Sequence, residues 1–114
     1  MELLKADKKV AREVIEKALQ KDLAESLEKT DVLIQKWKNE ILNNKETYYA
    51  LFDHVNMFDK YIARRYDNQR GSTYLTTIIG LFMDKIIDER DLVDFSIDVQ
   101  EYIKKLTNHL TKTD

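Results

Sequence analysis

The segment over residues 10–41 contains no proline, no glycine and no cluster of turn-forming residues. Its apolar residues recur mostly at steps of three and four, the spacing that puts side chains on one face of a helix. The pattern predicts a single helix over about residues 6–43, which is roughly 38 residues and about 57 Å long. The residues of this stripe are Val14, Ala18, Leu19, Leu23, Leu27, Thr30, Ile34, Trp37 and Ile41.

A soluble chain rarely leaves so long an apolar stripe exposed. Residues 44–114 form shorter helices that would cover only part of it, so we expect a second copy of the chain to cover the rest. A break at Thr30 and Asp31 is the alternative, because Thr30 can act as the N-cap of a new helix and would then give a compact bundle. The predicted dimer interface is Leu19, Leu23, Leu27, Ile34, Trp37 and Ile41.

The remaining chain also has helical periodicity, with no proline and only two glycines, so the predicted fold class is all-α. Asn43 and Asn44 end the long helix, because asparagine favours local backbone bonding over a helix. Three shorter helices are expected over residues 46–65, 74–87 and 89–110, the last with Asp88 as N-cap. We therefore predict one domain over residues 1–114, with residues 45–110 forming a small helical head.

Composition limits the cellular setting and the classes of ligand. The chain has no cysteine, which excludes disulfides and cysteine zinc sites. No apolar run reaches the ~18 residues of a membrane span, and the first residues lack the apolar block of a signal peptide. We therefore predict a cytoplasmic protein that binds no membrane. The net charge of −2 does not favour binding to nucleic acid.

The sequence offers little that resembles catalytic chemistry. The only histidines are His54 and His109, and neither lies at metal-binding helical spacing from another ligand. Several carboxylates lie four residues before a lysine, as in the pair Glu25 and Lys29, which is typical of surface ion pairs. There is no glycine-rich phosphate loop. We therefore predict no catalytic residues, no metal and no cofactor, and a protein that is not an enzyme.

Aromatic residues are concentrated between residues 48 and 74. Tyr48 and Phe52 share one face of the predicted second helix, whereas Tyr49 and Tyr61 point elsewhere. Packing under the long helix or across the dimer would need one face only. Because tyrosine and arginine are enriched where proteins bind each other, a surface for a protein partner is the second interpretation.

Two segments around the second helix carry a resemblance to a known family. The run from Tyr49 to Val55 and the run from Tyr61 to Asp67 resemble the fluorescence recovery proteins of cyanobacteria, whose pattern is Trp-x-Leu-x-Asp-Phe-Leu followed by Ile-Asp-Gly-Lys-Tyr-Asp. Upstream, residues 17–23 (Lys-Ala-Leu-Gln-Lys-Asp-Leu) resemble that family's Lys-Ala-Tyr-Gln-Arg-Glu-Leu. The residues that match without a gap are Leu51, Asp53, Ile62, Tyr66 and Asp67.

This resemblance implies an antiparallel, all-α homodimer built on the long helix, with a small helical head at each end. The family binds the C-terminal domain of the orange carotenoid protein and accelerates its return to the dark state. Such a protein has no substrate or cofactor, and acts by binding one state of its partner more tightly than the other.

The resemblance also indicates which residues contact the partner. Asp53 stands at an aspartate of the family's functional surface, and Tyr49 stands at a tryptophan. Phe52 replaces a polar residue and Asp59 replaces an arginine, and a reversed charge at a contact can cost several kcal/mol of binding. We therefore expect a divergent regulatory module with another protein as partner, or alternatively a structural adaptor whose dimer is its function. The predicted partner surface is Tyr49, Phe52, Asp53, Asp59, Lys60, Arg64 and Arg65.

Overall fold

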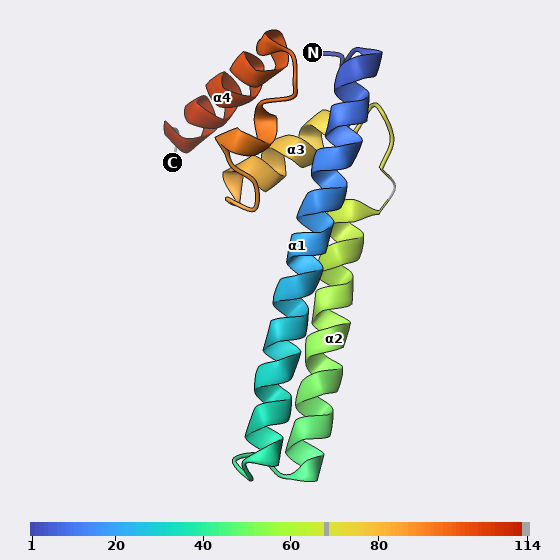
Figure 1. The fold of residues 1–114 in the computed structure, drawn as a ribbon, viewed down its shortest axis with the longest axis vertical. Coiled ribbons are helices and arrows are strands. Elements are labelled where there is room, and N and C mark those ends of the chain that lie inside the picture. The colour runs from blue at the N-terminus through green and yellow to red at the C-terminus, as the bar shows by residue number, and fades with distance from the viewer. Residues whose placement is uncertain (68, 113–114) are drawn as a thin grey trace. The chain divides into compact units, whose positions relative to one another are not determined.

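A computed structural model describes residues 1–67 and 69–112, with side chains up to residue 110. All regular elements in this part of the chain are helical, and no strand occurs in it. The all-α fold class and the long N-terminal helix are therefore confirmed. The elements are α1 (Lys5–Lys38), α2 (Asn44–Tyr66), α3 (Tyr74–Met83), the short 3₁₀-helix η1 (Glu89–Leu92) and α4 (Ile97–Lys112) (Figure 1).

The chain forms two compact units that share α1. Unit 1 comprises Met1–Leu19 with Asn68–Asp114, and unit 2 comprises Gln20–Asp67. The sequence placed residues 45–110 in one head, whereas the structure groups α2 with the second half of α1. The helix is continuous through Thr30 and Asp31. Thr30 Oγ1 donates to the carbonyl oxygen of Ser26 at 3.1 Å, a bond within the helix, so Thr30 does not cap a new one.

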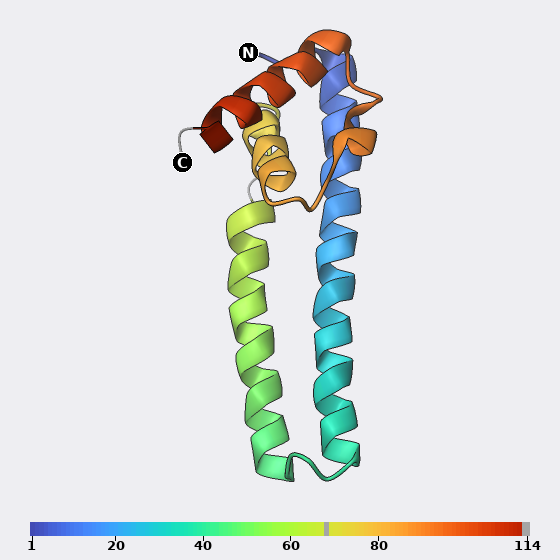
Figure 2. The ribbon, with the colours of Figure 1, turned by 90° about the vertical axis from the view of Figure 1, so that its left-hand side faces the viewer.

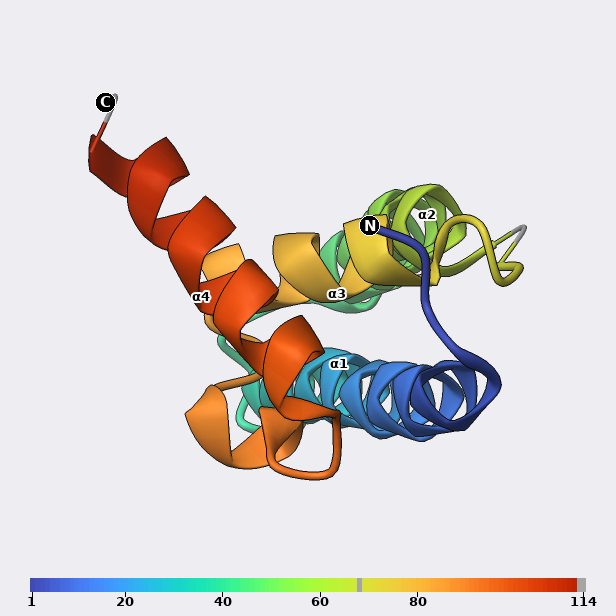
Figure 3. The same cartoon turned by 90° about the horizontal axis from the view of Figure 1, so that it is seen from above.

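Unit 1 has an apolar core formed by helices α1, α3 and α4. Figure 3 shows α4 crossing α3. Asp7 is buried and accepts hydrogen bonds from both the backbone N and Oγ of Ser96, each at 2.8 Å, directly before α4 begins. This carboxylate therefore joins the first turn of α1 to the start of α4. The buried apolar residues of the unit include Ala11, Val14, Ile15, Ala18, Ile78, Leu81, Leu92, Phe95, Val99 and Ile103.

Unit 2 is a helical hairpin in which α2 runs antiparallel to the second half of α1 (Figure 2). Asn43 starts α2 with a capping box, because its side chain accepts from the backbone N of Glu46 at 2.7 Å. The Glu46 carboxylate accepts in turn from the backbone N of Asn43 at 3.1 Å. The predicted boundaries of this second helix, residues 46–65, differ from the observed ones by one or two residues.

Two helices end earlier than predicted, and both end in the same way. The predicted helix over 6–43 stops at Lys38, because Glu40 takes a left-handed conformation with φ of 59°. The backbone N of Ile41 donates to Lys36 O at 2.9 Å, and that of Glu40 donates to Trp37 O at 3.1 Å. These two bonds define a Schellman motif.

The predicted helix over 74–87 ends at Met83 for the same reason. Lys85 has φ of 61°, and the backbone N of Ile86 donates to Leu81 O at 3.0 Å. Asp88 is an N-cap as predicted, but it caps the 3₁₀-helix Glu89–Leu92 and not the last α-helix. The last helix begins only at Ile97, so the predicted range 89–110 was too long at its start.

We expect glycine at either left-handed position to stabilise the chain. A side chain there costs roughly 1–2 kcal/mol in backbone strain, which glycine avoids, although glycine is also more flexible in the unfolded chain. Glu40→Gly and Lys85→Gly should each raise the free energy of unfolding by about 0.5–1 kcal/mol. Urea unfolding at a fixed protein concentration measures this change. The control, Lys36→Gly inside α1, should be destabilising by about 1 kcal/mol, and a loss of stability in the first two variants would contradict the prediction.

Candidate functional site

Four of the predicted partner-contact residues lie in one row along α2. Tyr49, Asp53, Lys60 and Arg64 are separated by four, seven and four residues, a spacing that keeps them on one side of a helix. All four are exposed, and Tyr49 retains 56% of its accessible surface. Neither Tyr49 nor Asp53 lies under the long helix, so this row is open to a partner. We call it the outer row.

The other three predicted contact residues lie elsewhere on α2. Arg65 is half-buried, and its guanidinium carbon lies 5.3 Å from the ring centroid of Tyr61, a cation–π contact within unit 2. Phe52 and Asp59 are exposed, but their helical positions group them with Val55 on a different side from the outer row. The structure therefore divides the predicted partner surface among three sides of α2.

The seam where α1 meets α2 is unexpectedly polar. Asp22 is buried, with 6% of its surface accessible, and its Oδ2 accepts from Tyr66 Oη at 2.6 Å and from Tyr61 Oη at 2.9 Å. One turn further along α1, the Oγ of Ser26 lies 2.9 Å from the Nε2 of His54, which belongs to α2. Two phenols thus satisfy a buried carboxylate, and polar bonds hold the two helices of the hairpin together.

Sequence reasoning missed this seam because it followed the apolar residues. Asp22 and Ser26 each stand one position before a leucine of the stripe, and polar residues of these two types are not expected to be buried. Asp22 and Ser26 are four residues apart, as are Leu23 and Leu27, so the polar pair forms a row on α1 beside the leucine row. This row is the only sign of the seam in the sequence. A row of polar residues on a helix is ordinarily interpreted as a surface exposed to solvent, so the spacing alone did not predict that these residues are buried between two helices.

The apolar stripe of α1 therefore lies beside the seam and not in it. Leu27 is 69% exposed and Leu23 is 37% exposed, while Ile34 is half-buried. The other predicted interface residues have different surroundings. Leu19 is half-buried and belongs to unit 1, Trp37 donates from Nε1 to Asn44 Oδ1 at 2.7 Å, and Ile41 lies exposed in the turn.

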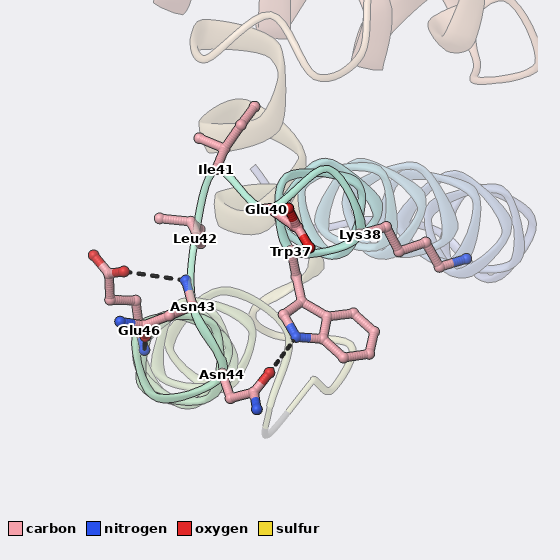
Figure 4. A pocket seen from close by; sticks show the side chains of 8 residues that line it. All are labelled: Trp37, Lys38, Glu40, Ile41, Leu42, Asn43, Asn44 and Glu46. Carbon is pink, nitrogen blue, oxygen red and sulfur yellow. Dashed lines mark hydrogen bonds between the residues drawn. The ribbon is translucent and has the colours of Figure 1, made fainter.

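Each unit has an open hollow. One, of about 630 Å³, lies at the turn of the hairpin, where the indole of Trp37 and the amide of Asn44 bond to each other (Figure 4). The other, of about 720 Å³, lies within unit 1 and is lined by Phe82 and Met83 of α3 and by Lys104 and Thr107 of α4, among others.

Burial and hydrogen bonding to Asp22 together raise the pKa of the Tyr66 phenol far above its usual value of 10.0. Burial is the larger cause, because it disfavours the charged phenolate, and the adjacent carboxylate adds to the effect. Tyr66 therefore stays protonated as a hydrogen-bond donor throughout the neutral range. Its role is to satisfy Asp22, which a phenolate could not do.

Within residues 1–67 and 69–112, no three histidine, aspartate or glutamate side chains come together in a way that could hold a metal ion. In the same part of the chain, no helix has the length and apolar content needed to cross a membrane.

Comparisons with known proteins do not assign the chain to a family. No model of a known protein family matches it, and no curated protein or solved structure matches it either. The functional argument therefore depends on the surfaces described above and on the sequence resemblance.

We expect Tyr66→Phe to destabilise the chain. The substitution removes one of the two phenolic donors to Asp22 and leaves a buried carboxylate less well satisfied, which typically costs about 1–3 kcal/mol. The free energy of unfolding from urea titration at a fixed protein concentration measures the loss. Tyr48→Phe, which changes an exposed tyrosine on the same helix, is the matched control and should be close to neutral. Equal stability in the two variants would show that the Asp22 network is not stabilising.

The contribution of Tyr66 should also disappear in alkali. Its pKa is raised in the folded chain, so its stabilisation is complete below the unfolded pKa of about 10 and is lost as the pH rises above it. The difference in free energy of unfolding between the parent chain and Tyr66→Phe should therefore narrow between pH 9 and pH 11. Other titrating groups are common to both proteins and cancel in this difference. A constant difference across the range would contradict the raised pKa.

Proposed function

We propose that this chain is a non-enzymatic, homodimeric module that binds another protein and regulates it. The observation that supports this most directly is the outer row, in which an aromatic anchor, a carboxylate and two basic groups lie exposed along one helix. Mixed aromatic and charged surfaces of this kind are typical of protein contacts, and such a row needs no cleft or cofactor.

The resemblance to fluorescence recovery proteins supports a regulatory role for this module. Its matched positions include Asp53, and Tyr49 keeps an aromatic residue at the family's tryptophan; both belong to the outer row. A module of this type works by having different affinities for two conformations of its partner, which shifts the partner's equilibrium. In the proposed function, the partner is a protein domain comparable to the C-terminal domain of the orange carotenoid protein.

The alternative function is a structural adaptor in which the dimer alone matters. The exposed apolar side chains of α1 favour self-association, whether or not the outer row binds a partner. The two functions differ in what the outer row contributes. A regulatory module needs Tyr49 and Asp53 for its activity, whereas an adaptor tolerates their replacement.

The regulatory function predicts that Tyr49→Ala and Asp53→Lys weaken binding to a carotenoid-protein C-terminal domain at least about tenfold each, because hot-spot and charge contacts are worth more than ~1.4 kcal/mol. Isothermal titration calorimetry with that purified domain measures the dissociation constant. Glu28→Lys, an exposed charge reversal on α1, is the control and should leave binding unchanged.

Light scattering on the same samples should give unchanged masses, since the outer row lies on α2 and the predicted dimer interface lies within residues 19–41. Unchanged binding in both outer-row variants would reject the outer row as the site. No binding by the parent chain would reject this class of partner and favour the adaptor.

A further inference from the structure

Basic side chains are concentrated on one side of unit 1, where α1 begins. Four of them follow one another at steps of three, one and three residues: Lys5, Lys8, Lys9 and Arg12. These steps keep the four side chains within about 100° of one another around the helix, over its first two turns. Lys8 is half-buried and the other three are exposed, so the four groups form one continuous positive surface.

The loop before α3 adds a fifth positive charge. A Cβ atom on Gly71 would lie 3.1 Å from Cε and 3.2 Å from Nζ of Lys8. The side chain of Lys8 therefore extends across the loop at a position where the absence of a side chain leaves room for it. Arg70 directly precedes this glycine and is exposed. We call the five residues the basic strip; they are Lys5, Lys8, Lys9, Arg12 and Arg70.

This arrangement of charge is unfavourable for the chain on its own. Lys5 and Lys8 lie in the first turn of α1, at the positive end of the helix dipole, where basic groups are disfavoured. Lys9 stands four residues after Lys5, which makes the two neighbours of like charge on the helix surface. Arg12 has the same relation to Lys8. A sequence that breaks several local rules at one place ordinarily does so where its residues serve a function.

The carboxylates of α1 do not compensate for the basic strip. Asp7 is buried and accepts its hydrogen bonds at the start of α4. Glu13 and Glu16 each follow a cation of the strip by four residues, which is the less favourable order for such a pair. Within residues 1–67 and 69–110, no carboxylate forms an ion pair with the strip. On another side of α1, by contrast, Lys17 Nζ lies 3.2 Å from Asp91 Oδ1.

We propose that the basic strip binds an acidic segment of another protein. Carboxylates placed along the strip neutralise its charge and remove the repulsion that the free chain carries. Lysine and arginine side chains bind carboxylates through charge-assisted hydrogen bonds, which are stronger than neutral ones. The strip belongs to unit 1 and the outer row belongs to unit 2, so this is a second surface, beyond the one in the proposed function.

The dimensions of the strip fit a short segment. From Lys5 to Arg12 it spans about 10.5 Å along the helix axis, at 1.5 Å per residue. This is the length of about three extended residues, so a segment of about six residues covers the strip and its edges. Leu4 lies one turn before Lys8 and retains 74% of its accessible surface. The expected segment therefore combines several carboxylates with an apolar residue that contacts Leu4.

An acidic protein segment fits the strip better than a nucleic acid or a membrane does. Residues 84–101 of the same unit include seven acidic and only two basic residues, which repel a long phosphate backbone. A helix that lies on a membrane surface buries its apolar side in the lipid. The apolar side of this part of α1 is buried in the core of unit 1 instead, through Ala11, Val14 and Ile15.

Removing charge from the strip tests the proposal. The probe is a fluorescein-labelled octapeptide of six glutamates and two leucines, and its fluorescence anisotropy at low salt measures the dissociation constant. The double variant Lys9→Gln with Arg12→Gln removes two of the five cations and should weaken binding at least about tenfold. The matched control, Lys36→Gln with Lys38→Gln, removes the same charge from exposed positions in the last turn of α1 and should leave binding unchanged.

Other probes test the chemistry of the partner. The same octapeptide with glutamine in place of glutamate should not bind, because it offers no charge to the strip. No binding of the acidic peptide by the parent chain would overturn the proposal, as would equal weakening in the two double variants. Tighter binding of single-stranded DNA or of phosphatidylserine vesicles at the same salt would overturn the choice of an acidic protein segment. None of these assays involves the outer row, so failure here leaves that surface untouched.

Urea unfolding of the same variants separates a binding role from a structural one. Lys9→Gln with Arg12→Gln removes both like-charged pairs, so its midpoint should stay the same or rise. Lys36→Gln with Lys38→Gln removes cations from the negative end of the helix dipole, so its midpoint should fall slightly. A lower midpoint in the strip variant would show that these cations stabilise the fold, and would overturn the inference that they serve a partner.

Discussion

The polar seam between α1 and α2 determines which side chains of unit 2 are exposed. A buried carboxylate satisfied by the Tyr61 and Tyr66 phenols, and a serine bonded to His54, hold the two helices together. Directional bonds of this kind fix the rotation of each helix about its own axis, because a turn of 100° would leave Asp22 buried without donors. With the rotation fixed, the apolar residues one step further must face outward. The exposure of Leu27, Phe52 and Val55 is thus a consequence of the seam.

The helices could be predicted from the sequence, but two of their ends could not. Apolar periodicity and the absence of proline were sufficient for α1, α2 and the fold class. The ends of α1 and α3 were missed because glutamate and lysine occupy left-handed positions that glycine usually takes. No neighbouring residue in the sequence indicates that Glu40 or Lys85 takes a left-handed backbone conformation. Their conformation is imposed by the Schellman bonds that each helix end makes, and these depend on the chain beyond the helix.

The candidate surfaces were predictable only in part, for a related reason. Spacing alone places Tyr49, Asp53, Lys60 and Arg64 in one row, and the structure leaves them exposed. Spacing could not reveal that Asp22 is buried or that Arg65 is half-buried. The burial of Asp22 depends on which residues of the other helix lie opposite it, and that relation joins positions about forty residues apart in sequence. Single-sequence periodicity carries no information about such pairs.

The division of α2 into three sides also changes how its differences from fluorescence recovery proteins are interpreted. Phe52, where that family has a polar residue, lies with Val55 on a different side of α2 from the outer row. The difference at Phe52 therefore leaves the outer row unchanged. Asp59, where the family has arginine, is exposed on the same side of α2 as Phe52. The resemblance at Tyr49 and Asp53 then belongs to a separate row of residues, which can keep its partner chemistry while the side of α2 with Phe52 and Asp59 diverges.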